Sequence, residues 1–128
     1  MNKIILIYLA LFLGTISCQE INERPSCSIV KTGTFKYLDA QDTTAYITID
    51  SSKHIEHISN GKYILASKIV WLSDCKYRVY LFSNTVPDLD YMRGDSLTVT
   101  INKTDGNLIY YTSEINGQRW QARMLKIK

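Results

Sequence analysis

The chain lacks a strong charge of either sign. Its 128 residues carry 15 Lys and Arg against 12 Asp and Glu, which leaves a formal net charge of +3 at pH 7. A nucleic-acid footprint needs a concentrated basic surface. Arg119, Arg123, Lys126 and Lys128 alternate with apolar residues, which is typical of the solvated face of a strand. We therefore expect no nucleic-acid partner.

Motifs of the common catalytic and cofactor sites are also missing. There is no Gly-x-Ser-x-Gly elbow and no glycine-rich phosphate loop. On a strand at 54–58, His54 and Glu56 would share one face and His57 would point away. Two ligands do not make a zinc site, so we interpret this cluster as a solvated polar strand. We expect no metal, no cofactor and no enzymatic activity.

No apolar run is long enough to span a bilayer as a helix, which takes about 20 residues. The first apolar run extends from Ile4 to Leu13, after Lys3, the only charge before Glu20. A basic start, about ten apolar residues and small residues before a cleavage point are the marks of a secretory signal. We expect residues 1–17 to be a signal helix that is removed on export, which leaves 111 residues with a net charge of +2.

The residues at the expected cleavage point, 15–18, resemble the lipobox of bacterial lipoproteins, in which a small residue precedes a cysteine that receives lipid. Here Ser17 precedes Cys18, although the family prefers Leu where Thr15 stands. The resemblance implies a lipid anchor on Cys18, with residues 18–26 as a lipidated cysteine and flexible tether. It also implies an outer-membrane location, because the residues after Cys18 lack the Asp that retains some lipoproteins at the inner membrane.

The chain has only three cysteines, an odd number, and they are Cys18, Cys27 and Cys75. If Cys18 carries lipid, Cys27 and Cys75 remain as a pair in an oxidising compartment, where disulfides persist. Their spacing is far from Cys-x-x-Cys, so we expect a structural bridge rather than redox catalysis.

No convincing helical pattern occurs in residues 27–128, and the composition of the whole chain, with nine Tyr and abundant Thr, Ile and Val, favours β structure. Turn signals at Asn60-Gly61, Asp105-Gly106 and Asn116-Gly117, and a longer loop at 84–95, separate alternating segments. The pattern predicts strands at 29–38, 43–50, 54–58, 63–72, 75–83, 96–103, 107–115 and 118–127. We read 63–72 as a strand covered on both sides, because it is densely apolar.

These strands predict an all-β fold, a single antiparallel domain of about eight strands arranged as a meander barrel or a sandwich. Gly33-Thr34-Phe35 resembles the Gly-x-Trp of lipocalins, which implies a barrel of that kind. Small barrels are usually filled by side chains, so we favour core roles over ligand contacts for the candidate aromatics. They are Phe35, Tyr37, Trp71, Tyr77 and Trp120.

A second resemblance covers most of residues 18–128 and is specific in two blocks. The blocks are Cys27 with Lys31-Thr32-Gly33-Thr34-Phe35, and Trp71-Leu72-Ser73-Asp74-Cys75-Lys76-Tyr77. They are similar to a group of short flavobacterial-type lipoproteins of unknown function. Some of that group carry the label DNA topoisomerase IV, which we judge a misnomer for an exported chain of this size.

We expect a non-enzymatic, membrane-anchored envelope lipoprotein that binds a protein partner or an apolar ligand, or serves a structural role. The first alternative is a secreted inhibitor of a hydrolase, with the 84–95 loop as its reactive element. The second alternative, an enzyme, lacks a constellation of residues with the required geometric roles.

Overall fold

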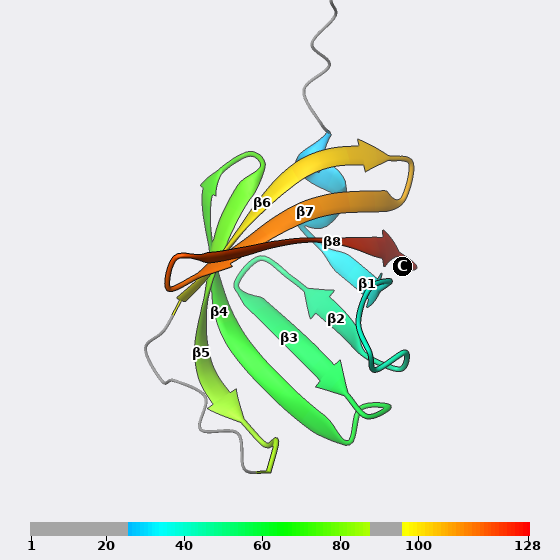
Figure 1. The fold of residues 1–128 in the computed structure, drawn as a ribbon, viewed down its shortest axis with the longest axis vertical. Helices are drawn as coiled ribbons and strands as arrows, with labels where there is room; N and C mark the ends of the chain where they lie inside the picture. Colours follow the sequence, from blue (N-terminus) through cyan, green and yellow to red (C-terminus); the bar gives the residue numbers. More distant parts are fainter. Residues whose placement is uncertain (1–25, 88–95) are drawn as a thin grey trace, which may run out of the picture.

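Eight antiparallel strands follow one another around a closed barrel in the computed structural model, which describes residues 26–87 and 96–128 (Figure 1). Each strand pairs with its neighbours in sequence, and β1 pairs with β8 to close the barrel. The predicted all-β meander is confirmed, and it is a barrel rather than a sandwich. The strands are β1 Gly33–Tyr37, β2 Tyr46–Ile49, β3 Lys53–Ile58, β4 Tyr63–Ser73, β5 Lys76–Asn84, β6 Ser96–Asp105, β7 Leu108–Ile115 and β8 Gln118–Lys126.

The turn residues set the pairing of the strands. Asn116 and Gly117, between β7 and β8, have φ angles of 50° and 78°. Two consecutive residues with positive φ suit the two-residue hairpins whose twist matches that of the flanking strands. Between β2 and β3, Asp50 accepts hydrogen bonds from the backbone N–H groups of Ser52 and Lys53, each at 2.8 Å, which fixes the register of this hairpin.

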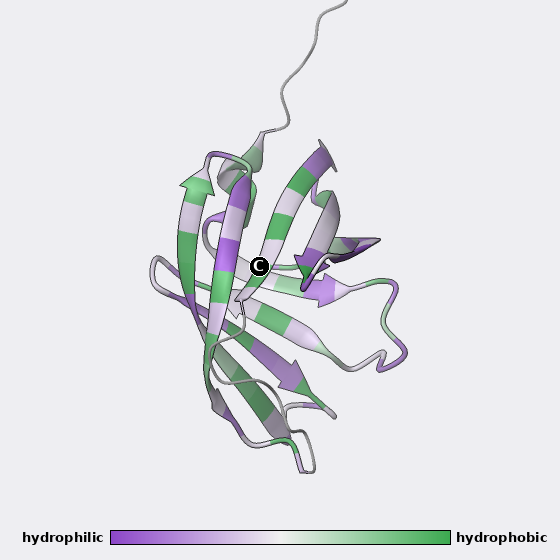
Figure 2. Cartoon of the chain, turned by 60° about the vertical axis from the view of Figure 1, so that its left-hand side comes forward, coloured by the Kyte–Doolittle hydropathy of each residue, from purple (hydrophilic) through white to green (hydrophobic). Residues whose placement is uncertain are grey.

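The core lies inside the barrel and follows from the two-residue alternation of strand side chains. Ile47 and Ile49 of β2, and Val99 and Ile101 of β6, are buried as the alternation predicts. Figure 2 shows the resulting bands of apolar and polar residues along the strands. Each such side chain contributes about 1.5–3 kcal/mol when fully buried.

The expectation that β4 is covered on both sides is wrong. Ser67 and Ile69 are buried, but Ile64 and Leu72 are exposed. The single sheet of a closed barrel covers only the inner face of each strand, so the apolar residues on the outer face of β4 stay in contact with solvent. An apolar run cannot by itself show whether a second layer exists.

The two ends of the barrel are built differently. We call one the sealed end: it carries the helix η1 (Cys27–Val30), the C-terminus and the connections at 50–52, 74–75 and 106–107. The other, the open end, carries the connections that follow β1, β3, β5 and β7. Figure 1 shows η1 beside the start of β1.

The 3₁₀ helix η1 corrects the prediction that a strand begins at residue 29. The adjacent residues Ile29 and Val30 both pack against the core, which a helical turn permits and a strand does not. Lys126 of β8 holds this turn in place, because its ammonium donates hydrogen bonds to the carbonyls of Ile29 and Thr32, each at 2.9 Å.

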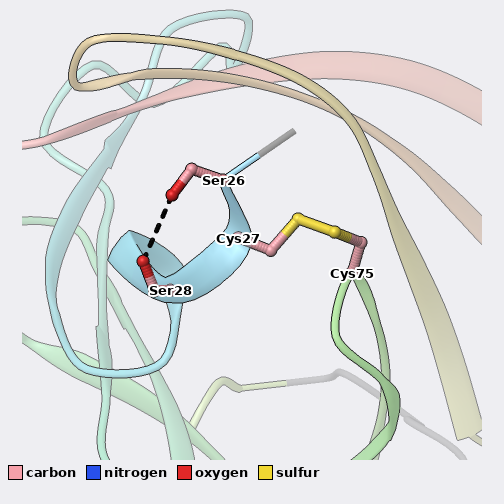
Figure 3. Close-up of a disulfide and its surroundings, with 4 residues drawn as sticks. All are labelled: Ser26, Cys27, Ser28 and Cys75. Atoms are coloured by element: carbon pink, nitrogen blue, oxygen red, sulfur yellow. Dashed lines mark hydrogen bonds between the residues drawn. A yellow bond between two sulfur atoms is a disulfide. The ribbon is translucent and has the colours of Figure 1, made fainter. Parts of the chain in front are cut away.

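A disulfide joins η1 to the β4–β5 connection. Cys27 and Cys75 are bonded with a Cα–Cα distance of 5.3 Å, within the usual range, and lie 48 residues apart in sequence (Figure 3). The predicted pair is confirmed. Cys18, the expected signal helix and the expected tether up to residue 25 lie outside the described residues. In the part of the chain that is described, no helix is both long and apolar enough to cross a membrane.

Candidate functional site

A cavity of about 290 Å³ enters the barrel from the open end, and we call it the barrel cavity. Asp39, Trp120 and Gln121 form an exposed rim, whereas Ile47 and Met124 are buried farther in. The cavity is therefore open to solvent at one end and bounded by the core at the other. A smaller space of about 100 Å³ adjoins it at His54, Glu56 and Leu97 and extends it toward Leu65, Leu81 and Ile115.

The sequence-predicted aromatics divide between two roles. Tyr37, Tyr77 and Trp120 line the barrel cavity, and Trp120 stays 45% exposed at the rim. Phe35 is 0% exposed within the core near the sealed end. Trp71 packs on Tyr77 with ring centroids 4.8 Å apart and lies beneath the Lys31 ammonium, 3.2 Å from the ring centroid. Phe35 and Trp71 therefore pack in the core, whereas Tyr37 and Trp120 border the cavity, and Tyr77 does both.

Small inward residues explain why the open half is not filled. Ser67 of β4 and Ser113 of β7 are buried, and Ala122 of β8 lines the cavity between Trp120 and Met124. These side chains are too short to reach across the barrel axis. The volume that larger residues would occupy is left empty, although interiors of small barrels are usually packed.

His54 and Glu56 point into the barrel, so the interpretation of a solvated strand is wrong. The β2–β3 register pairs His54 with the buried Ile49 and Glu56 with the buried Ile47. His54 is only 4% exposed, and both side chains line the cavity. The Asp50 turn sets this register, and cross-strand pairing with Ile47 and Ile49 was the signal that could have revealed it.

Glu56 is the centre of a polar cluster inside the cavity. The hydroxyl of Tyr37 donates a hydrogen bond to its Oε1 at 2.8 Å. Burial raises the pKa of the Tyr37 phenol well above its ordinary value, and the nearby Glu56 raises it further. Burial likewise raises the pKa of Tyr77 and of Tyr111, with contributions from Glu56 in both cases. These phenols therefore stay protonated at neutral pH.

The charge of the cavity comes from its carboxylates. Burial lowers the pKa of His54 below its ordinary value of 6.5, although Glu56 opposes that shift, so the imidazole is neutral at pH 7. No Lys or Arg among the described residues lines either part of the cavity. At the rim, Asp39 pairs with the Arg123 guanidinium at 2.9 Å, which leaves Glu56 as the carboxylate inside the barrel.

In residues 26–87 and 96–128, no group of three or more potential metal ligands lies together. His57 lies on the outer face, as its alternation with His54 and Glu56 predicts. Its ring stacks on Tyr46 with centroids 4.3 Å apart, and its Nε2 is 3.2 Å from the Thr48 hydroxyl.

Sequence reasoning also missed Tyr111, which shares the inward face of β7 with Ile109 and Ser113.

The loop expected to act in hydrolase inhibition, 84–95, lies mostly outside the described residues. No protein-family model matches this chain, and no curated protein or solved structure is significantly similar to it. The fold is that of an eight-stranded meander barrel, consistent with a lipocalin-like architecture.

Proposed function

We propose that the chain is an envelope lipoprotein whose barrel binds a small amphipathic molecule at its open end. The observation that carries this proposal is the barrel cavity, about 290 Å³ in volume and open at a rim that contains Trp120. Ligand sites are typically concave and mostly apolar, with a few polar groups that fix orientation. Leu97, Val99 and Met124 supply apolar walls, and Glu56 supplies a polar group inside.

The exposed aromatic rim supports binding in energetic terms. Trp120 is 45% exposed although it is among the largest apolar side chains of the chain. Covering its remaining apolar surface with a ligand would contribute about 25 cal/mol for each Å² removed from water.

The position of Cys27 at the sealed end is compatible with the proposed anchor. The proposed lipid on Cys18 would be followed by a tether that joins the barrel at Cys27, in the sealed end. The cavity mouth is at the opposite end, so attachment to the outer membrane would leave the mouth accessible. The Cys27–Cys75 disulfide agrees with an exported protein, because disulfides persist in oxidising compartments.

Ligand binding is tested with 1-naphthylamine, a neutral apolar dye of a size suited to the cavity, whose emission shifts when it leaves water. We expect the dye to bind the wild type and the substitution Leu97→Trp, which fills the cavity, to weaken binding at least about tenfold, or ~1.4 kcal/mol. Thr100→Trp, on the outer face of the same strand, is the matched control and should bind as the wild type does. A wild-type protein that does not bind the dye, or equal binding by Leu97→Trp, contradicts the proposal.

The anchor is tested by the mass of the intact protein extracted from membranes. We expect a mature chain that begins at Cys18 and carries acyl chains. The variant Cys18→Ser should lack the acyl mass and leave the membrane fraction. A mature wild-type protein with an unmodified Cys18 would refute lipidation without affecting the ligand proposal.

A further inference from the structure

Glu56 places a half-buried carboxylate among the mostly apolar walls of the cavity. Transfer of a charged group into an apolar environment is costly unless it is paired and hydrogen-bonded. Glu56 receives a hydrogen bond from the neutral Tyr37 hydroxyl, but no Lys or Arg of the described chain lines the cavity to balance its charge. The buried His54 beside it is neutral, since burial lowers its pKa. The cavity is therefore suited to a ligand that brings a positive charge.

Aromatic rings surround the same space. Tyr37, Tyr77, Tyr111 and Trp120 line the barrel cavity together with Glu56. The Tyr37 hydroxyl lies 2.8 Å from Oε1 of Glu56, and Tyr77 and Tyr111 line the same cavity. Aromatic faces attract cations, and clusters of them recognise ammonium groups in proteins. A carboxylate among aromatic rings combines two independent attractions for the same kind of group.

Ligands of other charge are less well matched. An anionic amphiphile would meet Glu56 inside the cavity and Asp39 at the rim, with Arg123 already engaged by Asp39 at 2.9 Å. A neutral amphiphile would contact the apolar walls but would bring no positive charge to the Glu56 carboxylate. The whole sequence carries a formal net charge of +3, which does not attract cations. A preference for a cationic ligand would therefore come from the local charge of the cavity.

We propose that the barrel cavity selects a cationic amphiphile, with an ammonium group beside Glu56 and a short apolar tail against Leu97, Val99 and Met124. This inference rests on the proposed ligand-binding function. At about 30 Å³ for each water-sized group, a cavity of this volume holds roughly ten non-hydrogen atoms. An octyl chain with a small head group is therefore a suitable probe.

The test compares three probes with the same octyl tail, namely octyltrimethylammonium, octanol and octanoate, by calorimetric titration of the wild-type protein at low salt. We expect the ammonium to bind at least about tenfold more tightly than the alcohol, and octanoate to bind most weakly. Equal affinities for the ammonium and the alcohol, or a preference for octanoate, would overturn the cation inference while the ligand-binding proposal stands. Failure of all three probes and of the neutral dye would overturn both.

The role of Glu56 is tested by Glu56→Gln, which keeps the shape of the side chain and an acceptor for the Tyr37 hydroxyl. We expect the preference for the ammonium over the alcohol to fall to within about threefold, with alcohol binding unchanged. Glu114→Gln, on the exposed face of β7, is the matched control and should keep the wild-type preference. An unchanged preference in Glu56→Gln contradicts the assignment, and if that variant does not fold, the wild-type ranking of the three probes decides.

Discussion

The sealed end and the open end of the barrel have the same strands but opposite packing. At the sealed end, η1 packs against the core and is linked to the β4–β5 connection by the Cys27–Cys75 disulfide. The Lys126 ammonium also donates a hydrogen bond to the Ile29 carbonyl of η1. At the open end, small inward residues leave a cavity with an exposed aromatic rim. Strand β1 passes from the packed half to the cavity: Phe35 is fully buried, and Tyr37, the next inward residue, lines the cavity.

This difference shows that the dense packing and the cavity lie in separate halves of a small barrel. A packed interior adds stability but leaves no room for a ligand, and a cavity forfeits contacts that packing would supply. A covalent bond and a dense core at one end can offset an unfilled interior at the other. Substitutions at the sealed end should therefore change stability, and substitutions at the open end should change binding.

Removal of the disulfide is the largest expected effect on stability. The double substitution Cys27→Ala/Cys75→Ala releases a loop of 48 residues, and the loop-entropy relation gives a loss of about 4 kcal/mol in the free energy of unfolding. Urea denaturation measures this loss. Dye affinity, measured with an osmolyte that keeps the variant folded, should match that of the wild type. A large loss of affinity in folded protein would show that the two halves are not independent.

Gly33→Ala is expected to have the next largest effect. Gly33 has a φ of 141°, and a Cβ there would lie 2.5 Å from the carbonyl oxygen of Lys128, where β1 and the C-terminus meet. We expect a loss of about 2 kcal/mol from strain and displaced backbone, measured by urea denaturation. Gly106→Ala is the control: its φ is also positive, at 58°, but the space around it is empty. It should lose only about 1 kcal/mol, and an equal loss would remove the close approach as the cause.

The pH dependence of stability is the smallest effect and belongs to the open half. Burial lowers the pKa of His54, which faces Glu56 and Tyr77, so the unfolded chain binds more protons than the folded one below about pH 6.5. The free energy of unfolding should be fully maintained above that pH and fall as the pH decreases through it, by at most about 1.4 kcal/mol per pH unit for one group. Denaturation of His54→Gln across pH 5–8 should show a weaker slope than the wild type. His57, whose pKa is also lowered by burial, should contribute to the slope that remains. An unchanged slope would show that His54 is not the titrating group.

Most of the fold could be predicted from the sequence because strand signals are local. Alternation at Ile47 and Ile49, and the Asn116-Gly117 turn, each act within a few residues, and the eight strands lie close to their expected bounds. The error at residues 29–32 has a nonlocal cause. The bond to Cys75 and the hydrogen bonds from Lys126 draw this segment into a helical turn, and neither contact is visible in the local pattern.

The candidate site was harder to predict, because a cavity depends on what faces it from all sides of the barrel. The sequence identified Tyr37, Tyr77 and Trp120 as candidates but could not show that Ala122 and Ser113 lie across from larger residues and leave a gap. His54 and Glu56 were assigned to solvent from their polarity alone. Polarity indicates exposure only on average, and a binding site is where that average fails.

An NMR titration of the isotope-labelled protein with octyltrimethylammonium tests the separation of the two halves most directly. We expect the amide signals of cavity residues such as Glu56, Tyr111 and Ala122 to shift on binding. Signals around Cys27 and Cys75 should stay unchanged. Shifts confined to the sealed end or to the outer face of the barrel, or no shifts at all, would contradict it.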